Sequence, residues 1–207
     1  MRHFEQEITD PAAWLAQDGD GWQCRERLTL SDMPLLLMRD FKETNHCSLT
    51  ALTSVFTYFR RQGVTGLPAD PQELFSWIRA KARAKWMFHP AIGTFPWQIA
   101  PLANQVWKRC HYPARARNVF FFPRRDALET LLIDELRALR PGIISFTHNR
   151  YHNHSVTFFG YEYWEKGNEH RIFLRVNNHW TRAPRFVELT HLGEGSDSYI
   201  ALCLFRL

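Results

Sequence analysis

Cys47, His154 and Asn178 are the three residues whose types and order could carry out nucleophilic chemistry in this chain. Cys47 stands in the string NHCSL, immediately before a stretch that is typical of a helix. A free thiol has a pKa of about 8.5. The positive end of a helix and a neighbouring imidazolium both favour the reactive thiolate. An imidazole in contact with the thiol can protonate a departing amine, and an amide oxygen can hold the ring in position for that transfer.

The other three cysteines have contexts that point away from catalysis. Cys24, Cys110 and Cys203 form neither a C-x-x-C pair nor a disulfide framework, so reduced thiols are expected. Cys203 lies in the apolar string YIALCLF and is predicted to be a core residue. Cys110 is followed by His111, but neighbours in an extended chain point to opposite faces.

The strands that carry His154 and Asn178 are predicted to be neighbours. Residues 154–164 and 170–178 have the pattern of strands, and the turn EKGNE (165–169) joins them into a hairpin. Folding the hairpin about this turn puts His154 opposite a residue between 178 and 182. Asn178 is then beside His154 or one diagonal step away, within side-chain reach.

A helix beginning at Cys47 is predicted by apolar residues that recur three and four positions apart over 47–61. Thr44 or Asn45 can cap its start. The same reasoning predicts further helices over 70–86, 97–109 (interrupted by Pro101) and 124–142, and further strands over 142–147, 185–189 and 198–207.

Helices followed by strands predict an α+β fold. We expect a single domain, 1–207, in which an N-terminal helical lobe (about 40–140) packs on a C-terminal antiparallel β-sheet (about 141–207). The composition, 45% hydrophobic, is ample for such a core. The candidate site is expected in the cleft between the two layers.

The order of these motifs resembles that of papain-like cysteine peptidases. A Cys at a helix N-terminus is followed by a His that opens a sheet strand, and then by an Asn two residues before a Trp. The segments that carry the resemblance are NHCSLTAL, NHSVTFFGY and VNNHW. The string HSVTFFGY is similar to the histidine strand of the bacteriocin-processing, double-glycine peptidases and their stand-alone bacterial relatives.

This resemblance implies a papain-like fold and hydrolysis of a peptide or amide bond through a thioester, without cofactor or metal. Cys47 would be the nucleophile, His154 the general base and acid, and Asn178 the orienting residue. Papain-like enzymes usually draw an oxyanion donor from a Gln shortly before the Cys, and 39–46 contain none. Asn45 is the candidate substitute, its carbonyl capping the helix and its amide donating beside the backbone N–H of Cys47.

Three alternatives remain open. The first is a catalytically weak papain-like binding module, to which the missing Gln points. The second is a metal site at His148, His152 and His154, although no carboxylate or further ligand follows at a recognisable spacing. The third is an adaptor that binds an anionic partner through the basic string RAKARAK (79–85). No nucleic-acid motif accompanies that string, so a solvated helix face is the simpler interpretation.

The aromatic-rich string MFHPAIGTFPWQ (87–98) is a candidate substrate wall. Most of its rings are also typical of a protein core. In the papain-like family, Ser48 stands where glycine is usual.

The expected compartment is the cytoplasm, and the expected partner is a peptide or protein substrate. The longest apolar runs are far shorter than the roughly 18 residues of a membrane span, so no membrane insertion is expected. The N-terminus carries acidic residues where a secretory leader would carry an apolar core.

Overall fold

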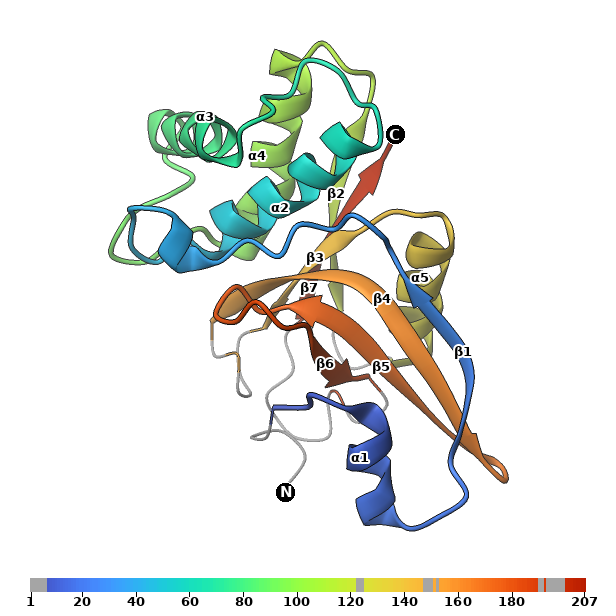
Figure 1. Cartoon of the computed structure of the whole chain (residues 1–207). Helices are drawn as coiled ribbons and strands as arrows, with labels where there is room; N and C mark the ends of the chain where they lie inside the picture. Colours follow the sequence, from blue (N-terminus) through green and yellow to red (C-terminus); the bar gives the residue numbers. More distant parts are fainter. Residues whose placement is uncertain (1–6, 122–124, 147–150, 152, 190–191, 193–199) are drawn as a thin grey trace.

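The computed structural model describes residues 7–121, 125–146, 151, 153–189, 192 and 200–207. Within them it has five α-helices and a seven-stranded antiparallel sheet, so the fold is α+β as predicted (Figure 1). The helices are α1 (Pro11–Leu15), α2 (Cys47–Arg61), α3 (Pro71–Ala84), α4 (Pro96–Arg109) and α5 (Arg125–Arg137). The strands are β1 (Gln23–Thr29), β2 (Arg115–Phe121), β3 (Gly142–Phe146), β4 (His154–Lys166), β5 (Glu169–Asn177), β6 (Arg185–Glu188) and β7 (Ile200–Arg206).

The long strand β4 organises the sheet, whose order is β2-β7-β3-β4-β5-β6 with β1 as an additional partner of β4. The first residues of β4 pair with β3, from His154 opposite Phe146 to Phe158 opposite Gly142. From Gly160 onward the same edge pairs with β1. A Cβ on Gly160 would lie 2.5 Å from the carbonyl oxygen of Leu28, so the close approach of β1 requires glycine there.

The predicted hairpin is confirmed. β4 and β5 pair antiparallel with Thr157 opposite Asn177, and the register shifts once, between Phe158 and Gly160. Continuing the ladder places residue 180 opposite His154, with Asn178 one diagonal step away. The predicted helix over 47–61 is also confirmed, since α2 has those bounds.

The separation into helices followed by strands differs from the structure in two respects. β1 and β2 come from segments for which no strand was predicted, because their sequences, QCRERLT and RARNVFF, lack the expected apolar alternation. α5 lies apart from α2, α3 and α4 and is tied to the sheet by ion pairs from Glu135 to Arg206 and from Arg137 to Glu26. α4 runs through Pro101 without interruption.

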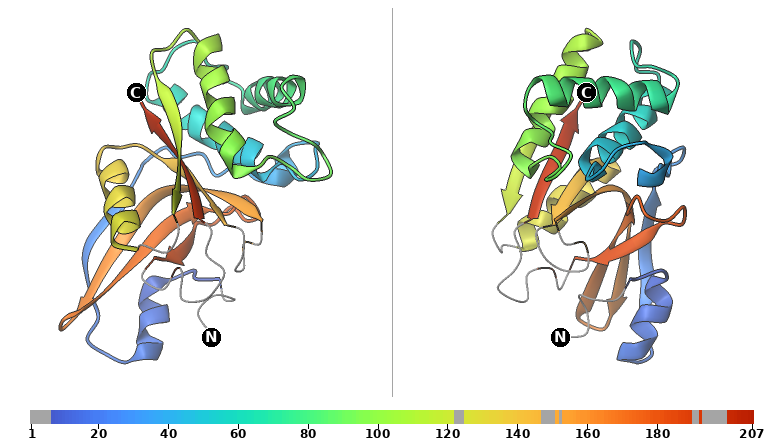
Figure 2. Two further views of the ribbon diagram at one scale, coloured as in Figure 1. Left: turned by 180° about the vertical axis from the view of Figure 1, so that it is seen from behind. Right: turned by 90° about the vertical axis from the view of Figure 1, so that its left-hand side faces the viewer.

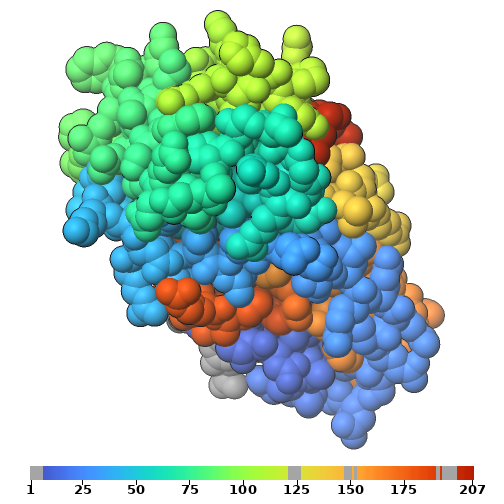
Figure 3. Space-filling view, turned by 45° about the horizontal axis from the view of Figure 1, so that its top comes forward, coloured from blue at the N-terminus to red at the C-terminus, as the bar shows by residue number. Residues whose placement is uncertain are grey.

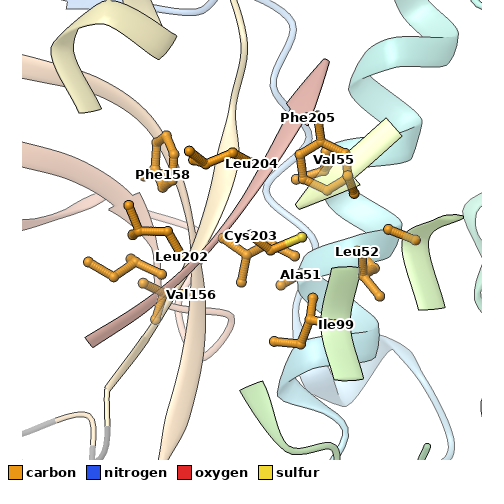
Figure 4. Close-up of a cluster of buried hydrophobic side chains, with 14 of the residues drawn as sticks. Ala51, Leu52, Val55, Ile99, Val156, Phe158, Leu202, Cys203, Leu204 and Phe205 are labelled. Atoms are coloured by element: carbon orange, nitrogen blue, oxygen red, sulfur yellow. The ribbon is translucent and has the colours of Figure 1, made fainter. Parts of the chain in front are cut away.

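α2 is the central helix of the molecule, and every side chain from Ser48 to Phe59 is buried. Figure 4 shows Ala51, Leu52 and Val55 of α2 facing β7, with Cys203 and Phe205 directed toward them. Polar positions of α2 are buried as well, and the Thr53 hydroxyl donates to the carbonyl of Leu49 at 2.8 Å. The helix is therefore held on several sides, which fixes the position of its N-terminus.

The helices α2, α3 and α4 form one group, and α1 lies at the far end of the sheet (Figure 2). α1 and the segment before it pack on the sheet through a second apolar cluster: Ile8, Trp14, Leu15, Trp164, Phe173 and Phe186. None of the described helices is long and apolar enough to cross a membrane.

Candidate active site

Cys47 is the first residue of α2, and its thiol is half-buried. The chain enters the helix through Asn45, whose φ of 48° lies in the left-handed region that Asn tolerates better than most residues. The first intrahelical bond runs from the Thr50 N–H to the His46 carbonyl at 2.9 Å. The N–H groups before Thr50 have no acceptor within the helix, so the sulfur lies at its positive end.

His154 begins β4, is buried, and contacts Asn178 through one ring nitrogen. Its Nε2 lies 2.8 Å from the backbone carbonyl oxygen of Asn178. A carbonyl oxygen can only accept, so Nε2 carries the proton and Nδ1 is left for another partner. His154 is also close enough to the Cys47 thiol to lower its pKa, so Nδ1 is the nitrogen available to the sulfur.

The pKa of the Cys47 thiol lies below its ordinary value. Burial on its own raises this pKa, but the hydrogen bond and the charge of His154 lower it, as do the backbone N–H of Ser155 and the hydroxyl of Ser48. The thiolate is therefore favoured beside the imidazole. In the other three cysteines the pKa is raised, with burial as the largest cause. Cys203 is a core residue, as predicted.

Asn178 reaches His154 through its backbone, which corrects the expectation that its side-chain amide orients the ring. The Asn178 Oδ1 accepts from the backbone N–H of Trp180 at 3.0 Å and of Thr181 at 3.1 Å. Its Nδ2 donates to Glu7 at 2.9 Å. Asn side chains readily form such local turns, and here the turn competes successfully with the imidazole.

The carbonyl of Asn178 is held in place by the segment that leads into α2. The amide of Asn177 and Nδ1 of His179 both contact the carbonyl of Leu36, at 3.1 and 2.9 Å, and the N–H of Met38 donates to the His179 carbonyl at 2.9 Å. Figure 3 shows these two segments, in blue and orange-red, lying against each other. The turn that orients His154 is thus bonded to the segment that leads into the helix of Cys47.

No protein-family model matches this chain, and no curated protein matches it in sequence. The interpretation of the site therefore depends on its geometry and on the motifs described above.

Asn45 does not cap α2, and its amide is engaged elsewhere. The residue at the N-cap position is His46, which makes no side-chain capping bond. The Nδ2 of Asn45 donates to the carbonyls of Pro90 at 2.7 Å and Ala91 at 3.1 Å, which accounts for both amide protons. The expectation that this amide donates to an oxyanion is thus not met in the structure. Asn45 instead fastens the loop before α4, and the backbone N–H of Cys47 is the remaining predicted donor.

A cleft of about 770 Å³ lies over Cys47 and His154. Residues 91–97 line it, so part of the aromatic-rich string does form a wall, whereas Phe88 of the same string is buried in the core. Trp180 also lines the cleft, and its ring stacks on His154 with the centroids 4.3 Å apart. The sequence indicated Trp180 only as the residue two positions after Asn178, because its place over His154 depends on the turn.

Ser48 faces the sheet. Its buried hydroxyl lies 3.0 Å from that of Ser155, which lies 2.8 Å from that of Ser145. This buried chain of hydroxyls ties the start of α2 to β4 and β3. No sequence pattern indicated it, because it joins residues that are far apart in the chain.

The structure bears on two of the alternatives, the metal site and the basic string 79–85. His148 and His152 lie outside the described residues, and the described residues contain no group of three His, Cys, Asp or Glu side chains that could hold a metal. Two basic side chains of the 79–85 string are engaged within the molecule, since Arg79 and Arg83 pair with Glu43 at 3.7 and 2.6 Å.

Proposed function

We propose that this protein is a papain-like cysteine hydrolase that cleaves a peptide or other amide bond with Cys47 as nucleophile and His154 as general acid and base. The observation that carries the proposal is the contact between a thiol of lowered pKa and an imidazole whose other nitrogen is fixed by the Asn178 carbonyl, at the floor of an open cleft. A nucleophile, a base and a group that orients the base are the parts that covalent catalysis requires.

In the proposed reaction the Cys47 thiolate attacks the substrate carbonyl and forms a C–S bond. The negative charge that develops on the oxygen is stabilised by the N–H of Cys47 and the positive end of α2. Nδ1 of the His154 imidazolium gives its proton to the amine as the C–N bond breaks, leaving a thioester. A water molecule then loses a proton to Nδ1 and attacks the thioester, which releases the acid and returns the proton to the Cys47–His154 pair.

Asn178 has a positioning role in this scheme. Its carbonyl holds the Nε2–H of His154, so the ring presents Nδ1 to the sulfur. A neutral carbonyl orients an imidazole as an amide side chain would, without adding a negative charge to the site.

Turnover of a mixed peptide library, with products identified by mass spectrometry, tests the proposal. The wild-type protein is expected to cut at defined bonds. Cys47→Ala and His154→Ala should each lower turnover by roughly a thousandfold or more, because the residues act as a unit. Cys24→Ala is the matched control: Cys24 is exposed and should be dispensable. Cleavage that survives Cys47→Ala would contradict the proposal.

A second candidate is a binding module with the same site but little hydrolysis. The engagement of the Asn45 amide by Pro90 and Ala91 favours it, because a side-chain oxyanion donor typically contributes a factor of about 10² to 10³ in rate. Binding of library peptides to the wild-type protein, without any cleavage and with an alkylatable Cys47, would identify this alternative.

A further inference from the structure

Two aromatic rings beside the nucleophile are exposed to solvent in a stacked pair. The Phe95 and Trp97 rings have centroids 4.6 Å apart and an interplanar angle of 4°. They are 42% and 53% exposed, and both line the cleft over Cys47. Exposed large apolar groups gathered at a cleft mark binding surfaces, because water contact is relieved when a ligand covers them.

The ring pair stands on a fixed backbone. The side chain of Gln98 accepts from the Phe95 N–H at 3.1 Å and donates to the carbonyl of Trp86 at 3.3 Å. Asn118 donates to the Trp97 carbonyl at 2.8 Å. Gly93, two residues before Phe95, packs closely on Asn45. A Cβ at Gly93 would lie 2.7 Å from the Asn45 carbonyl oxygen. The backbone that carries the two rings is thus held in place before any ligand arrives, which reduces the ordering cost of binding.

The described part of the cleft lining has few ionisable side chains. Of these residues only Cys47 and His154 can ionise, and none is Asp, Glu, Lys or Arg. A charged substrate group in contact with this part of the cleft would lose hydration without gaining a partner. A flat apolar group would gain contact with Phe95 and Trp97, and Trp180 provides a further ring on the sheet side.

We propose that the Phe95–Trp97 pair is a subsite for an aromatic side chain of the substrate next to the bond that is cleaved. This inference rests on the proposed function for the position of the bond, but the binding of the ring can be measured without turnover. The proposed substrates are peptides with an aromatic, uncharged residue near the scissile bond.

Binding is tested first in the Cys47→Ala protein, which cannot form the thioester. Three peptides, acetyl-Gly-Phe-Gly-amide and its Ala and Glu counterparts, are titrated into ¹⁵N-labelled protein while the indole N–H signals are followed by NMR. The Phe peptide should shift the Trp97 signal and bind at least about tenfold more tightly than the Ala and Glu peptides, which corresponds to about 1.4 kcal/mol. Trp86 is an internal control, since it lies in the loop that precedes α4, is 88% exposed and is not among the residues that line the cleft.

The second measurement is turnover by proteins that retain Cys47. Trp97→Ala should lower kcat/KM for aromatic peptides by about tenfold or more, a larger loss than for alanine peptides, whereas Trp86→Ala should change neither. Tight binding of the Phe peptide without turnover would overturn the proposed function and leave the subsite standing. Turnover without aromatic preference, equal binding of the three peptides, or a Trp86 shift as large as that of Trp97 would overturn the subsite.

Discussion

A single hydrogen bond sets the chemistry available at the residue scale. The Asn178 carbonyl accepts from Nε2 of His154, which leaves Nδ1 available to the sulfur of Cys47. The side chain of Asn178 contributes indirectly, by closing the turn that brings Trp180 over the imidazole. The role of Asn178 is therefore divided between its backbone, which orients the ring, and its side chain, which shapes the chain around it.

Replacing Asn178 separates these two roles. Ser at this position keeps a hydroxyl that can accept from the N–H groups of Trp180 and Thr181, whereas Ala cannot. We expect Asn178→Ser to keep kcat within about tenfold of wild type, and Asn178→Ala to lose about 1 kcal/mol of stability and more activity. Steady-state kinetics and urea unfolding of both variants measure this. Equal, large losses of kcat in two equally stable variants would show that the amide itself is required.

The sequence was sufficient to select Cys47, His154 and Asn178 but not the atom through which Asn178 acts. Residue types and spacing carry the first kind of information. The atom that acts is decided by a competition between a local turn and a contact across the hairpin. The turn prevails here, because the side-chain oxygen of Asn178 accepts three hydrogen bonds within it. The partners of the Asn45 amide could not be predicted either, because Pro90 and Ala91 are distant from Asn45 in the chain.

At the scale of elements, the start of α2 is fixed from several sides. The Ser48, Ser155 and Ser145 hydroxyls tie it to the sheet, and Asn45 ties it to the loop that ends in the ring pair. The helix and the hairpin were predicted because their apolar periodicities are strong. β1 was missed because it is a polar strand, largely exposed, whose place beside β4 depends on Gly160.

Asn45→Asp tests the connection between the helix start and the loop. The variant loses both donors to Pro90 and Ala91 and turns a carboxylate toward their carbonyls, so the 89–95 loop should loosen. Limited proteolysis within 89–95 is expected to become about tenfold faster, while alkylation of Cys47 near pH 6 persists. Asn45→Gly keeps the left-handed backbone and lacks the amide, so it should loosen the loop as well. Unchanged proteolysis in both variants would contradict an anchoring role.

For the molecule as a whole, the buried His179 links stability to pH. Burial lowers its pKa from 6.5 to about 3, while its neutral ring bridges the Leu36 carbonyl and the Thr157 hydroxyl. The unfolded chain binds a proton near pH 6.5, and the folded chain does so only near pH 3. The free energy of unfolding therefore falls as the pH drops from 6.5 toward 3, by up to about 1.4 kcal/mol per pH unit from this group.

His179→Gln should flatten that dependence. The variant is expected to be less stable at neutral pH, because it loses contacts to Leu36 and Thr157, but its urea midpoint should fall less between pH 6.5 and 4. Some dependence will remain, since burial also lowers the pKa of His46. His111→Gln, which replaces an exposed histidine, is the matched control. A slope in His179→Gln equal to that of wild type would contradict this assignment.

The most direct test of the account is the pH profile of Cys47 alkylation by iodoacetamide, resolved for each cysteine by peptide mass spectrometry. In the wild-type protein Cys47 should react near pH 6 and faster than the exposed Cys24, whose pKa is raised, and its rate should fall only as the pH drops through the lowered pKa of the thiol. In His154→Gln the effect of burial on Cys47 is no longer offset by the imidazole, so its profile should move to higher pH. A Cys47 that reacts only above about pH 8.5, or whose profile is the same in His154→Gln, would contradict the central claim that folding joins this thiol and this imidazole into one reactive pair.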